Sequence, residues 1–110
     1  MTGVKYDQDK PDYSLLPYGA LEQVVQVLTY GSKKYDRNNW EHVPDLTNRY
    51  TAAAFRHIVA YSKGELNDEE TGLSHLAHAI CCLMFMCQND INMDMDMDAE
   101  ITQIGILNER

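Results

Sequence analysis

Carboxylates and histidines gather between residues 56 and 78. The carboxylates lie in a short turn between two apolar segments and the histidines flank that turn; they are Glu65, Asp68, Glu69, Glu70, His57, His75 and His78. Hard divalent cations prefer oxygen ligands, and imidazoles can complete or orient such a shell. The pattern predicts a metal centre for phosphate chemistry, with these candidate ligands: Glu65, Asp68, Glu69, His57 and His75.

The role of each histidine stays open at this level. His75 and His78 are three residues apart, so on a helix they would be neighbours on one face, which Cys82 would continue one turn later. Such a pair also occurs by chance. His57 falls within an apolar stripe, where a histidine is more often a hydrogen-bonded core residue than a ligand. Direct ligation and orientation of other ligands are both compatible with the spacing.

A second group of residues combines positive charge with aromatic rings. Lys33, Lys34 and Arg37 are suited to a triphosphate, while Tyr35 or Trp40 could stack on a base. The alternative is a solvated loop that Trp40 holds to the core.

Two further cations, Lys5 and Lys10, lie in a segment that alternates charged residues with turn formers and shows no helical or strand period. We expect an extended arm there. Either the arm folds over the site and brings its lysines to phosphates, or it is a frayed terminus.

Apolar periodicity predicts the helices that must position these residues. Residues spaced at i, i+3, i+4 and i+7 predict a first helix over residues 17–30, with Gly31 as its end. Asp45 is expected to cap a second helix that runs to Lys63 and stops at Gly64. Two apolar stripes on this second helix indicate that it is covered on both sides.

The third predicted helix covers residues 72–88, with Thr71 as its cap. Between Leu73 and Cys87 it carries no charge except on histidines, so it is expected to be central. Residues 93–98 alternate Met and Asp; a solvated linker is favoured over a strand or a soft-metal site. A short amphipathic tail follows, weakened by Gly105 and expected to pack loosely or to swap, with Ile101, Ile104, Ile106 and Leu107.

The predicted fold class is therefore all-α: a small bundle of three main helices plus a short C-terminal element. We assign residues 1–90 to the helical domain and residues 91–110 to the Met/Asp linker and tail. A chain of 110 residues with an apolar share of 45% is expected to gain stability by self-association.

Charge and composition exclude several partners. A net charge of −8 and a pI near 4.7 would repel nucleic acid and anionic membranes. No signal peptide and no membrane span is recognisable. The cysteines, Cys81, Cys82 and Cys87, share one apolar segment in which the adjacent pair cannot easily bridge, as is typical of a reducing cytosol. We expect a cytoplasmic protein that binds neither nucleic acid nor membranes.

Taken together, the motifs resemble the dATP/dGTP diphosphohydrolase family, which occurs chiefly in bacteriophages, is related to MazG-like all-α nucleoside triphosphate pyrophosphohydrolases and includes the MazZ enzymes. The resemblance covers residues 4 to 87 and is carried by these motifs in order: Lys5-Tyr6-Asp7-x-x-Lys10-Pro11, Leu15-Leu16-Pro17, Tyr30-Gly31-x-Lys33-Lys34-Tyr35, Asn39-Trp40, Arg49-Tyr50, Arg56-His57, Gly64-Glu65-x-x-Asp68-x-Glu70-Thr71-Gly72 and His75-Leu76-x-His78-Ala79.

The resemblance implies an oligomeric MazG-like bundle, a dimer or tetramer, that binds a purine deoxynucleotide and Mg²⁺, with Mn²⁺ or Co²⁺ able to substitute. It implies hydrolysis of dGTP or dATP to the monophosphate and pyrophosphate, which adjusts the deoxynucleotide pool during infection in the host cytosol. The chain departs from MazG proteins in lacking Glu-x-x-Glu, and Glu65-x-x-Asp68 is a partial counterpart. Cys82 stands where the family carries asparagine.

Within that interpretation, Glu65 or Glu69 is expected to take a proton from the attacking water, with His78 as a further catalytic residue. Substrate binding is assigned to the basic, aromatic and amide side chains of the motifs: Lys5, Lys10, Lys33, Lys34, Tyr35, Asn39, Trp40 and Arg56.

Two other functions fit parts of the pattern. A transition-metal phosphohydrolase of the histidine-aspartate type would use His57, His75 and His78 with an acidic residue, although the chain has no adjacent His-Asp pair. A non-enzymatic helical regulator would use the apolar third helix as an oligomer seam and leave the acidic turn as a solvated connection.

Overall fold

Three α-helices carry the fold in the computed structural model, which describes residues 2–108 and their side chains as far as residue 99. They are α1 (Tyr18–Tyr35), α2 (Leu46–Ser62) and α3 (His75–Asn108), with short 3-10 helices η1 (Tyr13–Leu15) and η2 (Asn39–His42). Within the described residues the only strand-like pairing is an isolated bridge between Asn67 and Ser74. The all-helical class is confirmed.

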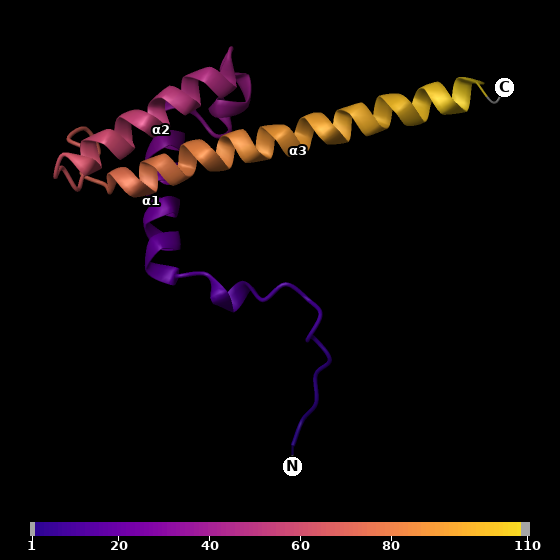
Figure 1. Cartoon of the computed structure of the whole chain (residues 1–110), viewed down its shortest axis with the longest axis horizontal. Helices are drawn as coiled ribbons and strands as arrows, with labels where there is room; N and C mark the ends of the chain where they lie inside the picture. Colours follow the sequence, from indigo (N-terminus) through magenta and orange to yellow (C-terminus); the bar gives the residue numbers. More distant parts are fainter. Residues whose placement is uncertain (1, 109–110) are drawn as a thin grey trace.

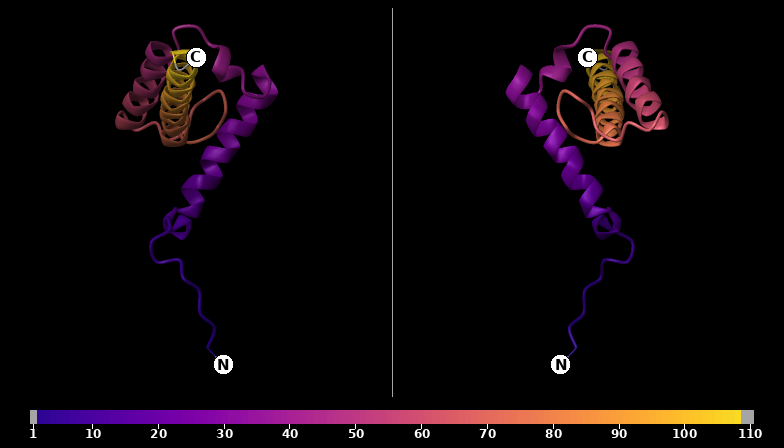
Figure 2. Two further views of the ribbon diagram at one scale, coloured as in Figure 1. Left: turned by 90° about the vertical axis from the view of Figure 1, so that its right-hand side faces the viewer. Right: turned by 90° about the vertical axis from the view of Figure 1, so that its left-hand side faces the viewer.

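The three helices do not lie parallel. α2 and the first half of α3 run side by side in opposite directions, while α1 crosses them steeply (Figures 1 and 2). α1 contacts α3 through the middle of its own length. The loop of residues 63–74 joins α2 to α3 and turns beside the crossing. Four elements, α1, η2, α2 and α3, therefore meet around one region, and this region holds the site.

The buried core at the crossing is small. Val24 and Val27 of α1 pack against Ala77 and Cys81 of α3. Small side chains on α3 let the α1 backbone approach closely, which is the packing that a steep crossing requires. This part of α3 contacts both α1 and α2, so its expected central position is confirmed for one face only, because Leu83 on its outer face is 53% exposed.

Large apolar side chains remain exposed on the outer faces of α2 and α3. Phe55 is 61% exposed and Leu83 53%, and Val59, Leu76 and Ile80 are also exposed. A monomer rarely leaves so many large side chains in water. The expected self-association is consistent with these faces and stays a prediction.

The first predicted helix end is wrong. α1 continues through Gly31 to Tyr35, where Asp36 at a φ of 93° ends it. One internal glycine costs a helix only about 1 kcal/mol, which packing readily offsets. Lys33 and Lys34 then stand in the last turn, where the helix dipole favours positive charge. They lie on a helix rather than in a loop.

The second helix matches its prediction within a residue at each end, but its cap differs. Asp45 does stand at the N-cap, in a left-handed conformation at a φ of 54°, yet its side chain makes no capping hydrogen bond to the backbone. Its Oδ1 instead accepts from Asn48 Nδ2 at 3.0 Å. Gly64, at a φ of 98°, follows the end of the helix as predicted.

The predicted cap of the third helix is also wrong. Ser74 Oγ accepts from the backbone N–H groups of Leu76 and Ala77 at 3.1 and 3.3 Å, so α3 begins at His75 rather than at residue 72. Gly72 at a φ of 71° keeps the preceding residues out of the helix. Thr71 is thereby free for the site.

The Met/Asp segment is helical, which corrects the expected irregular linker. α3 runs through it without a break, and Gln88 Nε2 donates to Asn92 Oδ1 at 3.1 Å one turn apart. Methionine is a good helix former, and no proline or glycine interrupts residues 73–104. The side chains of the predicted apolar tail lie outside the described part. The division of the chain at residue 90 stays a prediction.

The N-terminal arm runs away from the helices (Figure 1). Every residue from 2 to 23 is exposed, and Lys5 and Lys10 lie on this arm. The arm therefore does not fold over the site of its own chain. No helix within the described residues is long and apolar enough to cross a membrane.

Candidate active site

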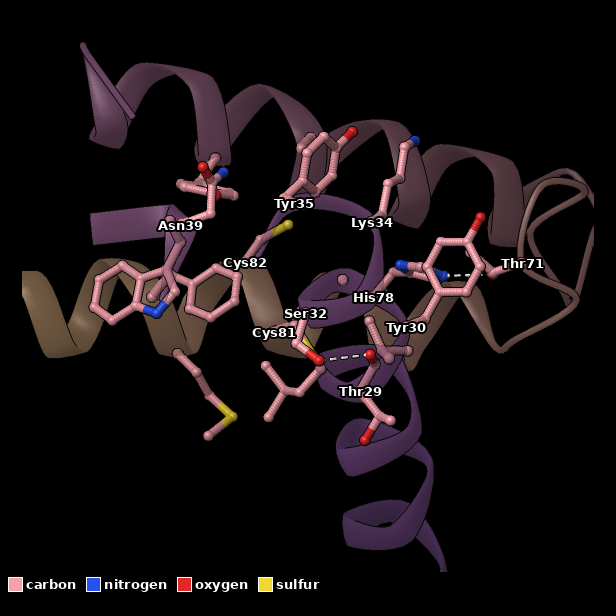
Figure 3. Close-up of a pocket in the computed structure, with 18 of the residues that line it drawn as sticks. Thr29, Tyr30, Ser32, Lys34, Tyr35, Asn39, Thr71, His78, Cys81 and Cys82 are labelled. Carbon is pink, nitrogen blue, oxygen red and sulfur yellow. Dashed lines mark hydrogen bonds between the residues drawn. The ribbon is translucent and has the colours of Figure 1, made fainter. Parts of the chain in front are cut away.

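A cavity of about 870 Å³ opens where α1, η2, α2 and α3 meet (Figure 3). This volume lies within the range of small-molecule sites. One end of the cavity is lined by histidines and carboxylates from α2, α3 and the loop between them. The other end is lined by aromatic rings from η2, α2 and α3.

Two histidine rings stack at the polar end. His57 of α2 and His78 of α3 have ring centroids 4.6 Å apart and planes 8° apart. His78 Nε2 lies 2.8 Å from Thr71 Oγ1 (Figure 3). The loop residue Thr71 thereby fixes the orientation of a ring on α3.

Asp68 is held by the same threonine. Its Oδ2 accepts from the Thr71 N–H at 3.0 Å and from Thr71 Oγ1 at 3.2 Å. Burial works to raise the pKa of Asp68, but the Thr71 hydrogen bonds and the neighbouring histidines outweigh it, so this pKa is lowered. Asp68 is therefore an ionised carboxylate beside two imidazoles.

His75 lies beneath this pair and is only 5% exposed. Its Nδ1 is 2.8 Å from His57 Nδ1, and its Nε2 is 3.3 Å from Glu65 Oε1. Nε2 is buried and has no hydrogen-bond partner among the described residues. Donor atoms of His57, Asp68 and His75 all lie within 4.8 Å of one another.

The pKa values of the two histidines that line the cavity, His57 and His78, are lowered, which favours their neutral forms. Burial lowers the pKa of His57, and the neighbouring His78 and His75 lower it further. Burial also lowers the pKa of His78, although Asp68 partly opposes this. Neutral imidazoles can accept a proton or bind a metal ion, whereas imidazolium can do neither.

One wall of the cavity joins α1 to the acidic loop. Lys34 of α1 forms an ion pair with Glu70 Oε1, to which the Tyr30 hydroxyl also donates at 3.4 Å. The hydrogen bond with Glu70 raises the pKa of Lys34, so its ammonium stays charged. Arg56 of α2 adds an exposed guanidinium to the same cavity.

The apolar end is built from three rings. Trp40 of η2 stacks on Phe85 of α3, with centroids 4.9 Å apart and planes 11° apart. Tyr50 of α2 meets the edge of Phe85 at 5.2 Å. Gln88, three residues after Phe85, also lines the cavity and carries an amide group. These rings offer flat apolar surface for a planar ring system, and the Gln88 amide adds a hydrogen-bonding group to the same cavity.

The structure divides the predicted site residues into two groups. Those that line the cavity are Lys34, Tyr35, Arg37, Asn39, Trp40, Arg56, His57, Asp68 and His78. Those that do not are Lys5, Lys10, Lys33, Glu65, Glu69 and His75. Lys33 is exposed on α1 and Glu69 is exposed on the loop. Their individual roles stay predictions.

Several lining residues were missed by sequence reasoning. Thr71 was taken as a helix cap, while Tyr50, Phe85 and Gln88 received no role in the site. A signal for two of them exists, because Phe85 and Gln88 follow His78 and Cys81 at helical spacing on one face of α3. Nothing local marks Tyr50, which reaches the cavity through the packing of α2.

The arrangement does not provide an all-oxygen cage for a resident Mg²⁺. Of the four loop carboxylates, Glu70 is paired with Lys34, Glu65 faces His75 and Glu69 is exposed. Only Asp68 converges with other donors, and those donors are imidazoles. Mg²⁺ prefers octahedral oxygen coordination, so this donor set does not suit it.

A protein-family model described as "dATP/dGTP diphosphohydrolase, N-terminal" matches residues 1–100. A protein of Salmonella phage PMBT28 named "dATP/dGTP diphosphohydrolase" is 42% identical over 86 residues. The match covers 78% of this chain but only 29% of that relative, so the chain spans less than a third of the relative's length. No solved structure matches the chain.

Proposed function

The chain belongs to the dATP/dGTP diphosphohydrolase family, and on that premise we propose that it hydrolyses dGTP or dATP to the monophosphate and pyrophosphate. The observation that carries the proposal is the cavity with two chemically different ends. A purine nucleotide has the same division, with a flat base at one end and a charged phosphate chain at the other.

We propose that the base binds at the aromatic end. Phe85 covers one face of Trp40. Tyr35 and Asn39, which precede Trp40 closely in the sequence, also line the cavity. Stacking on an aromatic face stabilises a base by about 1–3 kcal/mol. Amide groups of Asn39 and Gln88 supply donors and acceptors for the edge of a purine.

The phosphate chain is placed toward the polar end. Arg56 offers a planar set of donors that suits phosphate oxygens. Lys34 is bound to Glu70, and an incoming triphosphate would compete with that carboxylate for the ammonium. Positive charge at these positions offsets the charge that builds on the phosphate oxygens during transfer.

His78 is the proposed general base. It lines the cavity, burial favours its neutral form, and Thr71 fixes its ring. A neutral imidazole within reach of a water can take its proton as the water attacks phosphorus. Glu69 is exposed, Glu65 faces His75, and neither lines the cavity, so we favour His78 over these two carboxylates.

Mg²⁺ remains our proposal for the ion that accompanies the triphosphate, with Mn²⁺ or Co²⁺ able to substitute. Its chemistry when bound is to neutralise phosphate oxygens. We further propose a MazG-like bundle that associates as a dimer or tetramer through the exposed faces of α2 and α3. Its role would be to adjust the purine deoxynucleotide pool in the host cytosol during phage infection.

The test is to incubate the purified chain with each common deoxy- and ribonucleoside triphosphate, with Mg²⁺ and with EDTA, and to resolve the products by chromatography. We expect metal-dependent formation of dGMP or dAMP together with pyrophosphate and no diphosphate. Release of inorganic phosphate would indicate a different phosphohydrolase. Survival of every nucleotide with Mg²⁺, Mn²⁺ and Co²⁺ in a folded sample would refute hydrolysis by this chain.

A further inference from the structure

We propose that His57, His75 and Asp68 form a binding site for one transition-metal ion, with Glu65 as the residue that orients His75. The site is held by the protein itself and is separate from any ion that a nucleotide brings. It does not depend on the proposed hydrolysis, because ion binding is measured directly.

The three donors already stand at ligand spacing. His57 Nδ1 and His75 Nδ1 are 2.8 Å apart. One ring nitrogen of each histidine and one oxygen of Asp68 all lie within 4.8 Å of one another. A transition ion holds imidazole nitrogens at about 2.0–2.1 Å, which places two such ligands about 3 Å apart. The two rings therefore need to separate by only a few tenths of an ångström to admit an ion.

The contact between the two histidines also fits this role. One Nδ1 donates its hydrogen to the other Nδ1, so a single proton occupies the space between two lone pairs that could share a cation. On ion binding that proton moves to the Nε2 atom of the ring that donates it. Both rings stay neutral and both present Nδ1 to the ion.

Glu65 explains the buried nitrogen that lacks a partner. His75 Nε2 is 3.3 Å from Glu65 Oε1 but makes no hydrogen bond. A metal-bound histidine typically donates its other ring N–H to a carboxylate, which fixes the tautomer and the ring orientation. With Nδ1 on the ion, His75 Nε2–H would face the Glu65 carboxylate, and the unpaired atom would be satisfied.

Hydrogen bonds likewise fix the orientation of the Asp68 carboxylate. Both of its hydrogen bonds from Thr71 go to Oδ2, which leaves Oδ1 for the ion. Thr71 in turn contacts His78 at 2.8 Å, so the proposed ion site and the proposed general base share one hydroxyl. The remaining coordination positions would be open to water or phosphate oxygens from the cavity.

Donor chemistry selects the class of ion. Two imidazoles and one carboxylate suit divalent ions of the Mn²⁺ to Zn²⁺ series, whereas Mg²⁺ is bound mainly through oxygen and retains several waters. The site should therefore take Co²⁺, Mn²⁺ or Zn²⁺ in the presence of a large excess of Mg²⁺.

The experiment is a Co²⁺ titration of the untagged, EDTA-treated full chain, followed by its visible ligand-field absorption. We expect one saturable Co²⁺ site per chain that excess Mg²⁺ does not displace and that Zn²⁺ does displace. His57→Ala and Asp68→Asn should abolish the band, while Glu65→Gln should weaken binding by about 10- to 100-fold.

Two controls match these variants. His42→Ala removes the histidine that lies outside the cavity and is exposed on η2, and Cys87→Ser removes the exposed thiol; neither should alter the titration. Because His75 is buried, its replacement could unfold the chain, so His57 and Asp68 carry the test and far-UV circular dichroism checks each variant.

A band that survives in both His57→Ala and Asp68→Asn, or that Mg²⁺ displaces at equal concentration, overturns the proposal. Co²⁺ binding without nucleotide turnover would leave it intact and would count against the proposed function alone.

Discussion

The two halves of α3 have the same backbone conformation and very different surroundings. Residues 75–88 pack against α1, η2 and α2 and contribute His75, His78, Cys81, Cys82 and Phe85 to the core or the site. Beyond residue 90 the helix extends away from the other elements, and Met93, Met95 and Met97 are all more than 60% exposed (Figure 1). Helical conformation is a local property, whereas a site arises only where several elements meet.

The largest effect is expected from His78→Asn, in the packed half. The shorter amide does not reach the position of His78 Nε2 and cannot act as a base near neutral pH. Removal of a general base typically lowers kcat by about 10²- to 10⁴-fold. Steady-state kinetics on dGTP and dATP would measure this, with KM expected to change little. His42→Ala is the matched control and should keep full activity; an unchanged kcat in His78→Asn would exclude His78 as the base.

A smaller effect, on the pH dependence of stability, is expected from the buried cysteines of the same helix. Burial raises the pKa of the Cys81 thiol to about 12 and also raises that of Cys82, whereas Cys87 is exposed. A raised folded-state pKa contributes stability below the unfolded value of 9.0, and this contribution is lost as pH rises from there toward 12. The free energy of unfolding should therefore fall above about pH 9, and Cys81→Ala should show a shallower fall.

Alkylation provides the independent measurement for the same prediction. Cys87 should react with iodoacetamide in the folded chain at pH 8, and Cys81 and Cys82 only after denaturation, as followed by mass spectrometry. Equal labelling of the three thiols in folded protein would show that the packed half of α3 is open.

The smallest effect is expected at the exposed half. Met93→Gln, Met95→Gln and Met97→Gln in one variant remove apolar surface that contacts nothing in the site, so turnover and Co²⁺ affinity should stay within about twofold, as for surface substitutions in general. Size-exclusion chromatography of the same variant tests whether this half carries an oligomer contact. A marked loss of turnover in a variant that keeps its oligomeric state would contradict the assignment of the site to residues 1–90.

The family and the helical class were predictable because each depends on order along the chain. The motifs from Lys5 to Ala79 occur in a fixed sequence, and the comparisons confirm the family. Apolar periodicity located three helices because side-chain burial repeats with the helical turn. Gly64 marked the end of α2 correctly, since a left-handed residue after a helix is a local requirement.

Helix ends and the linker were harder to predict because they depend on competing contacts. Gly31 lies inside α1, and Thr71 serves Asp68 and His78 instead of a helix terminus. The Met/Asp alternation showed no helical period, yet α3 continues through it. Methionine favours the helix and no glycine or proline interrupts it there.

By itself, the sequence determined which chemical groups are present: carboxylates in one turn, histidines beside it, and cations and aromatic rings within residues 33–40. Only the tertiary structure decided which of them meet. It brought His57 to His75 and His78 across two helices and placed Asp68 and Glu65 of the loop beside them. It also joined Lys34 to Glu70 across 36 residues of chain. The physical reason is that a site depends on distances between side chains from different elements, and those distances are set by how the helices cross.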